Sequence, residues 1–201
     1  GGAKISTKIK MINFFLDNAD SIFVGGAMAF TFLKSKGLNV GLSMVENDML
    51  DIAKEIIEKS KLINKKIIFP LDVVCVKNNI DSNKIFIKNI NNLEDNDIGL
   101  DIGPQTIKIF KNKINNLDTI IWNGPLGLFE NKNFSHGTIK ISKFLKKMKN
   151  KITIIGGGDT VSAIEMYDTL NGFSHVSTGG GASLKLLSGE KLNLTKSWEM
   201  Y

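Results

Sequence analysis

Arginine is absent from this chain of 201 residues, so all 26 of its basic side chains are lysines. Arginine is the side chain that grips carboxylates and phosphates through two parallel hydrogen bonds. An anion that binds here must instead be held by lysine ammonium groups, backbone N–H groups or a metal ion. The net charge is +6, but the lysines are scattered, and aromatic residues do not alternate with them as a platform for single-stranded nucleic acid requires. We therefore expect no nucleic-acid partner.

The sequence also lacks the features of secreted and membrane proteins. Its one cysteine, Cys75, cannot form an internal disulfide, which fits a reducing compartment. Cys75 lies in an apolar run with no histidine nearby, so we interpret it as a buried thiol rather than a nucleophile. No apolar run approaches the roughly 20 residues that span a bilayer, and there is no signal-peptide pattern. We expect a cytoplasmic protein without a membrane partner and, because the chain begins without Met, a piece of something longer.

Short apolar runs alternate with amphipathic segments along the chain. We expect strands at residues 21–24, 66–76, 119–122 and 151–155. Helices are expected at residues 46–61, 103–113 and 143–149, the last with a lysine-rich wet face. The polar, Asn-rich residues 77–100 are interpreted as a surface excursion with a strand-like island at 85–87. This order predicts an α/β fold, a Rossmann-like three-layer sandwich whose mainly parallel sheet has helices on both faces.

Glycines gather where the expected strands end. The clusters are Gly25-Gly26, Gly124, Gly156-Gly157-Gly158 and Gly179-Gly180-Gly181. In open parallel sheets ligands bind beyond the carboxyl ends of the strands. Ordinary tight turns explain any one cluster but explain all four poorly. We therefore expect one crevice lined by backbone.

Residues 156–160 form a strand-to-helix turn that presents N–H groups and the helix dipole to phosphate. The turn is neither a Walker loop nor a Rossmann fingerprint, since Val161 stands where the third glycine should be. Asp159 has two interpretations: a helix N-cap, favoured by this segment alone, or a carboxylate that binds Mg²⁺ among phosphate-binding amides. Lys4 and Lys8, one helical turn apart, are either solvated or share an anion.

Six segments, taken in order, resemble successive signatures of phosphoglycerate kinase, from its C-terminal, nucleotide-binding half. They are residues 1–8, 25–33, 99–104, 122–130, 156–160 and 174–183, and the resemblance covers residues 1–192. The string Trp122-Asn123-Gly124-Pro125, which continues to Glu130, is similar to that family's adenosine-binding segment. Residues 193–201 form a divergent tail. The resemblance also implies a first strand before Gly1 and an N-terminal lobe that this chain does not contain.

The resemblance implies a two-lobed, monomeric kinase of glycolysis. Such an enzyme reversibly transfers a phosphoryl group between 1,3-bisphosphoglycerate and ADP, giving 3-phosphoglycerate and MgATP. The acyl phosphate is a reactive donor and the ADP oxygen is already ionised, so no general base is required. The substrate 3-phosphoglycerate would bind through the missing N-terminal lobe. This chain alone is therefore expected to have weak activity or none.

The same resemblance assigns roles to particular residues. Lys8 would hold the transferring phosphoryl group, Lys4 would support the phosphate end, and Asp159 would bind Mg²⁺. Amides near the nucleotide phosphates would come from Gly157, Gly158 and Thr160. Gly179 and Gly180 would offer amides to the transition state.

Other residues would hold the nucleoside. Glu130 would accept hydrogen bonds from the ribose hydroxyls. The adenine slot would be lined by Gly25, Gly26 and Gly99, with Asn123 and Pro125 nearby.

Two other functions are kept as alternatives. A non-catalytic remnant that binds nucleotide or a partner protein is favoured by the missing lobe and the tail. A dehydrogenase-like dinucleotide domain is disfavoured by the failed fingerprint.

Overall fold

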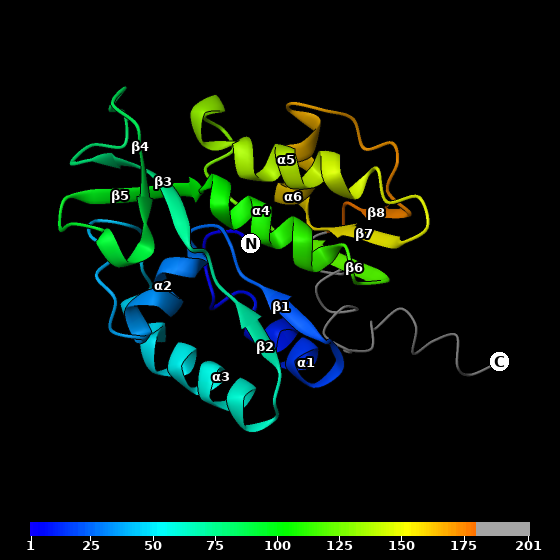
Figure 1. The fold of residues 1–201 in the computed structure, drawn as a ribbon, viewed down its shortest axis with the longest axis horizontal. Coiled ribbons are helices and arrows are strands. Elements are labelled where there is room, and N and C mark those ends of the chain that lie inside the picture. The colour runs from blue at the N-terminus through cyan, green and yellow to red at the C-terminus, as the bar shows by residue number, and fades with distance from the viewer. Residues whose placement is uncertain (180–201) are drawn as a thin grey trace.

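A computed structural model of the chain describes residues 1–179. Its helices are α1 (Ile9–Asn18), α2 (Met28–Ser35), α3 (Leu50–Leu62), α4 (Pro104–Ile114), α5 (His136–Leu145) and α6 (Gly158–Glu165) (Figure 1). The strands are β1 (Ser21–Phe23), β2 (Lys66–Ile68), β3 (Asp72–Lys77), β4 (Phe86–Asn89), β5 (Asp97–Ile102), β6 (Thr119–Asn123), β7 (Ile152–Gly156) and β8 (His175–Ser177). Short 3₁₀ turns occupy Asn47–Met49, Ile90–Asn92 and Lys132–Phe134.

The strands form three hydrogen-bonded groups. Strands β6, β7 and β8 pair in parallel, in that order, and β1 pairs in parallel with β2. Strand β3 lies between β4 and β5 and is antiparallel to both. The predicted α/β class with mainly parallel pairing is confirmed, and the antiparallel group is an addition to it.

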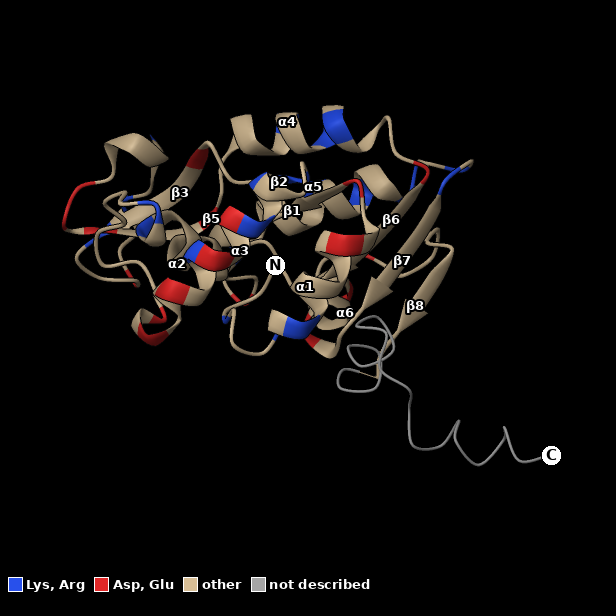
Figure 2. Cartoon of the chain, turned by 90° about the horizontal axis from the view of Figure 1, so that it is seen from below, with Lys and Arg blue, Asp and Glu red and all other residues tan. Residues whose placement is uncertain are grey.

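Helices cover the strands because each presents an apolar stripe. Buried residues of α4, α5 and α6 pack on β6 and β7, among them Phe110, Leu145 and Ile164. A second cluster joins α1, α2 and α3 beside β1, with Leu16 and Phe32 fully buried. Acidic and basic side chains are interspersed over the elements drawn in Figure 2. No helix within residues 1–179 is long and apolar enough to cross a membrane.

Two expected helices have different bounds in the structure. The helix expected from residue 46 begins at Leu50, because a 3₁₀ turn at Asn47–Met49 precedes it. The helix expected over residues 143–149 is α5, which starts at His136 and ends at Leu145. Beyond it, the N–H of Met148 bonds the carbonyl of Leu145, three residues back, so the chain tightens into a turn toward β7.

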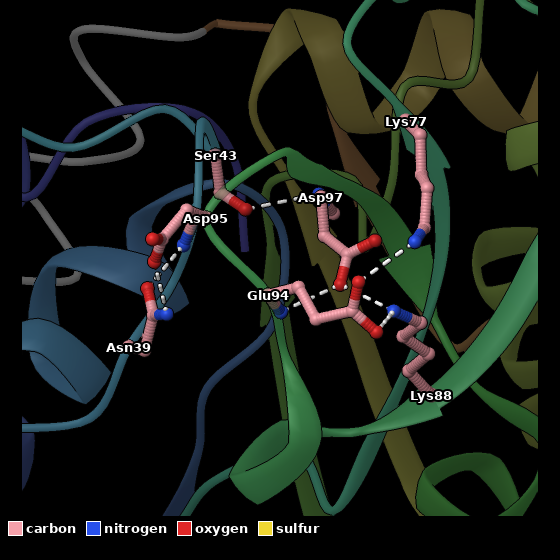
Figure 3. A network of polar contacts seen from close by, with 9 residues as sticks. Asn39, Ser43, Lys77, Lys88, Glu94, Asp95 and Asp97 are labelled. Atoms are coloured by element: carbon pink, nitrogen blue, oxygen red, sulfur yellow. Dashed lines mark hydrogen bonds and ion pairs between the residues drawn. The ribbon is translucent and has the colours of Figure 1, made fainter.

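The strand-like island expected at residues 85–87 is present as β4, but the surface excursion expected around it is wrong from residue 97, where β5 begins. These strands contain polar residues, and the residues that hydrogen-bond to them lie elsewhere in the sequence. The local pattern therefore does not indicate a buried strand. Asp97 is fully buried in β5 and accepts from Lys88 of β4 at 2.7 Å. The Glu94 carboxylate forms ion pairs with Nζ of Lys77 at 2.7 Å and with Nζ of Lys88 at 2.8 Å (Figure 3). This network holds the antiparallel group together. The expected strand over residues 66–76 is likewise two strands, β2 and β3.

Candidate functional site

The first two residues thread between the ends of β1 and β6. The amine of Gly1 donates to the carbonyl of Asn123 at 2.8 Å, and the N–H of Gly2 to that of Pro125 at 2.7 Å. A Cβ on Gly26 would lie 2.6 Å from the nitrogen of Gly2, and Gly26 has φ +70°, so only glycine fits there. The glycine clusters after β1 and β6 therefore meet at one place, as predicted.

The cluster after β7 joins the same place through side chains. Asn123 donates from Nδ2 to the carbonyl of Gly156 at 2.9 Å. The fully buried Thr160 hydroxyl donates to that carbonyl at 2.8 Å and accepts from the N–H of Gly124 at 2.6 Å. These bonds fix the loop after β6 against the start of α6. The fourth cluster begins with the exposed Gly179; Gly180 and Gly181 lie outside the described residues.

Lys8 is the charged centre of this region. Its side chain is buried, and Nζ donates to Oδ1 of Asn123. Burial lowers the pKa of Lys8 to about 8, while the charge of Asp159 opposes that shift. An ammonium with a depressed pKa is stabilised by any further anion that reaches it. The charge of Asp159 thus acts on Lys8, although the two residues lie far apart in the sequence.

Asp159 lies on the exposed first turn of α6. The N-cap of this helix is Gly157, at φ +94°, and no side chain caps it. The interpretation of Asp159 as the cap is therefore wrong, which leaves its carboxylate available to solvent and ligands. The neighbouring Gly158 is exposed, and a Cβ added there would have no atom within 4 Å. The N–H groups of Gly157 and Thr160 already bond the carbonyls of Ser177 and Gly157.

The arrangement suits a phosphate-bearing ligand with a cation. A buried lysine, an exposed helix N-terminal turn and one carboxylate converge at strand ends. Magnesium is commonly held by one or two carboxylates together with substrate phosphates. The donor set around Asp159 fits that pattern. Within residues 1–179, no group of three or more His, Cys, Asp or Glu side chains that could hold a metal ion occurs.

Comparison with known proteins identifies the family. A sequence model described as phosphoglycerate kinase matches residues 1–190. The chain belongs to the phosphoglycerate kinase family. The phosphoglycerate kinase of Thermosipho africanus is 48% identical over 197 residues, covering 96% of this chain and 48% of that protein. The one from Finegoldia magna is 49% identical over 192 residues, with the same coverage.

Solved phosphoglycerate kinases share the fold. The structure from Coxiella burnetii superposes with a TM-score of 0.90 at 38% identity, over 94% of this chain and 49% of that one. The structure from Pyrococcus horikoshii gives 0.83 at 26% identity, over 100% of this chain and 52% of that one. The chain spans about half the length of the curated relatives it matches.

The other residues expected from the phosphoglycerate kinase resemblance differ in exposure. Lys4 and Glu130 are exposed, whereas Pro125, Gly25 and Gly99 are buried. A Cβ on Gly25 would lie 2.7 Å from Leu126, and one on Gly99 would lie 2.1 Å from the ring of Phe30. Both glycines thus allow close packing. The loop that carries Glu130 is tied to the turn that follows α6, because the Tyr167 hydroxyl donates to the carbonyl of Phe129 at 2.8 Å.

Two acidic residues near the site escaped the sequence analysis. Glu46 accepts from the N–H of Ile5 at 2.5 Å and from the hydroxyl of Ser6 at 2.5 Å, so it fixes the segment between Lys4 and Lys8. Asp101 is buried in β5 and accepts from the N–H groups of Ile102 and Gly137, each at 2.8 Å. Burial raises the pKa of Asp101 to about 7. Nothing local in the sequence marks either contact, since the partners of Glu46 lie about 40 residues away.

Proposed function

We propose that this chain is the nucleotide-binding half of an enzyme that reversibly transfers a phosphoryl group between 1,3-bisphosphoglycerate and ADP. The products are 3-phosphoglycerate and MgATP. The observation that supports it most is the buried Lys8 ammonium, which donates to Asn123 at the end of β6 and is influenced by the charge of Asp159 at the start of α6. In this proposal residues 1–192 form the nucleotide-binding lobe. The 3-phosphoglycerate site belongs to a further lobe, and the enzyme works as a monomer in the cytoplasm.

The proposed chemistry breaks the P–O bond to the acyl carboxylate and forms one to a terminal phosphate oxygen of ADP. The carboxylate leaves as an anion and no proton moves, so alignment and charge neutralisation carry catalysis. Lys8 holds the transferring group, and Lys4 neutralises charge at its edge. Amides of Gly158, Gly179 and Gly180 hold phosphate oxygens, whereas those of Gly157 and Thr160 bond backbone carbonyls in this structure. Magnesium, when bound, neutralises charge on the nucleotide phosphates, and Asp159 is its protein ligand.

The nucleoside end of the proposed site lies across the loop after β6. Glu130 is exposed and able to accept from ribose hydroxyls. Gly25, Gly26 and Gly99 would give the adenine ring access to backbone, next to Asn123 and Pro125. The fixed position of this loop against α6 supports one continuous nucleotide site.

Calorimetric titration with ADP and ATP, with and without Mg²⁺ and with NAD as a control, tests this proposal. We expect saturable, Mg²⁺-dependent binding of ADP or ATP and none of NAD. Asp159→Ala should weaken the Mg²⁺-dependent binding by about tenfold, or 1.4 kcal/mol. The matched control is Glu165→Ala, which removes an exposed acid from the other end of the same helix. It should leave affinity unchanged.

A chain that unfolds cooperatively but binds neither nucleotide would overturn the competent-lobe proposal. That result would favour the non-catalytic remnant. Equal losses in Asp159→Ala and Glu165→Ala would remove Asp159 from the site.

A further inference from the structure

The positive charge of the chain is concentrated in two segments. Residues 102–117 and 131–158 hold ten lysines and no acidic residue. The other 16 lysines and the 20 acids of the chain sum to −4, so these two segments account for the whole net charge of +6. The segments contain α4 and α5, which pack against each other over the same core (Figure 1). Two acid-free helices therefore lie side by side.

Four of these lysines follow the line along which the two helices meet. On α4, Lys108 and Lys111 are three residues apart, so they lie on the same side of the helix. On α5, Lys140 and Phe144 are four residues apart, and Lys147 follows in the turn just beyond the helix. The Nζ atom of Lys111 lies 5.6 Å from the centre of the Phe144 ring, which brings the two rows together. We call Lys108, Lys111, Lys140 and Lys147 the lysine face.

The ammonium groups of the lysine face repel one another. The pKa of Lys111 is lowered, first by burial and then by the charges of Lys140 and Lys147, and no carboxylate within residues 1–179 offsets that shift. The neighbouring Lys146, by contrast, forms an ion pair with Asp168 at 3.0 Å. Within the part of the chain that the structure describes, none of the four lysines of the lysine face has such a partner. Like charges held together destabilise the folded chain, so a bound polyanion would stabilise it.

The chemistry of the lysine face favours a chain of phosphate groups without bases. A lysine ammonium is a compact point charge that binds phosphate oxygens, without the paired geometry that arginine offers to carboxylates. The one aromatic residue, Phe144, is half-buried under Lys111, so the face has no platform on which nucleic-acid bases would stack. Among residues 1–179, no large apolar side chain that is exposed lies on α4 or α5, so nothing there would insert into a bilayer. Lysine is also depleted at protein–protein interfaces.

We propose that the lysine face binds linear inorganic polyphosphate, a flexible chain of phosphate groups. The chain lies along the two helices, and its oxygens neutralise the ammonium groups that repel one another. From Lys140 to Lys147 the face spans about 10 Å at 1.5 Å per residue, so several successive phosphates are engaged at once. The site is distinct from the proposed nucleotide function and does not depend on it.

Calorimetric titration of the 201-residue chain with long-chain inorganic polyphosphate, at several salt concentrations and without Mg²⁺, tests this proposal. We expect saturable binding and a higher melting temperature. Because bound phosphates release counterions, a plot of log affinity against log salt concentration should have a slope of about −3 for four engaged lysines. No saturable binding by a chain that unfolds cooperatively would overturn the proposal.

Neutralising part of the lysine face should remove most of the binding. The triple variant Lys111→Gln/Lys140→Gln/Lys147→Gln should reduce the salt slope to about −1 and weaken binding at low salt by about tenfold or more. An unchanged slope and affinity in this variant would contradict the lysine face as the site.

Two control variants separate the lysine face from net charge and from the candidate nucleotide site. Lys54→Gln/Lys61→Gln/Lys66→Gln removes the same charge from exposed positions elsewhere, and Lys8→Gln removes the ammonium of the candidate site. Each should change polyphosphate affinity by less than about threefold. Equal losses in the two triple variants would mean that net charge alone attracts the polymer. A loss in Lys8→Gln as large as in the lysine-face variant would place the polymer at the nucleotide site. Either result would overturn the proposal.

Other polyanions test the choice of ligand. An oligo(dT) strand, poly-glutamate and vesicles that contain phosphatidylserine present phosphodiesters, carboxylates and a lipid surface. At matched charge, each should bind more weakly than polyphosphate, by about fivefold or more. Equal or tighter binding of any of them, lost in the lysine-face variant, would overturn the assignment to polyphosphate.

Discussion

The free energy of unfolding should depend on pH through the buried carboxyl of Asp101. Replacing Asp101 by asparagine should remove that contribution. The side chain is 3% exposed and accepts from the N–H groups of Ile102 and Gly137. Its pKa rises from 3.8 to about 7 because burial disfavours the charged form more than the backbone donors favour it. The folded state therefore holds a proton that the unfolded state releases near pH 4.

The sign follows from proton counting. Between pH 4 and pH 7 the folded chain binds more protons at Asp101 than the unfolded chain does, so stability falls as the pH rises. A shift from 3.8 to about 7 corresponds to about 4 kcal/mol over the full range, at 1.36 kcal/mol per unit. Between pH 5 and pH 7.5 the same two values give a loss on the order of 2–3 kcal/mol.

Urea unfolding of the parent and of Asp101→Asn at pH 5, 6, 7 and 7.5 measures this effect. Other groups titrate in both proteins, so the difference between the two curves isolates Asp101. That difference should change by a few kcal/mol, on the order of 2–3, across the range, with the parent losing more stability as the pH rises. A difference that stays constant with pH would refute the protonated, buried carboxyl.

Two further changes test the packing of the site by denaturant unfolding. Thr160→Val leaves the N–H of Gly124 without its acceptor and should cost about 1–3 kcal/mol; an unaltered midpoint would mean that water replaces the hydroxyl. Gly99→Ala drives a methyl into the Phe30 ring and should cost about 1–3 kcal/mol. Its control, Gly158→Ala, meets no atom within 4 Å and should change stability by less than about 1 kcal/mol. Equal losses in both glycine variants would contradict this packing.

Three of the parallel strands could be predicted because each is a short apolar run that ends at or just before a glycine. Strands β1, β6 and β7 all follow this pattern, and the meeting of their ends follows from the geometry of parallel sheets. The antiparallel group could not be predicted in the same way. Within β5, Asp97 depends on Lys88, Gly99 on the ring of Phe30 and Asp101 on Gly137. Those partners lie on other elements, so the strand looks polar when taken alone.

In the candidate site, too, local features could be predicted from the sequence and long-range contacts could not. The glycine turns are local signals and could be found in the sequence. The electrostatic effect of Asp159 on Lys8 is a long-range interaction that no spacing encodes. Local reasoning marked each residue separately, as a possible Mg²⁺ ligand and a possible anion-binding lysine, and the family resemblance assigned both to one site. Glu46 was missed because its carboxylate accepts hydrogen bonds from the backbone N–H groups of Ile5 and Ser6. Every residue except proline carries such a group, so the sequence does not mark the contact. The N-cap at Gly157 was missed because the left-handed φ of a glycine replaced the expected polar cap.

The ties between the loop after β6 and the elements that follow it have a consequence for ligand length. Asn123 donates to the carbonyl of Gly156 at the end of β7, the N–H of Gly124 donates to the Thr160 hydroxyl in α6, and Tyr167, just beyond α6, donates to the carbonyl of Phe129. In the proposed arrangement the loop carries the ribose acceptor Glu130, and α6 carries the metal ligand Asp159. Their separation is then set before any ligand arrives. A nucleotide with too few phosphates would therefore reach only one of these two residues and leave the other without a ligand.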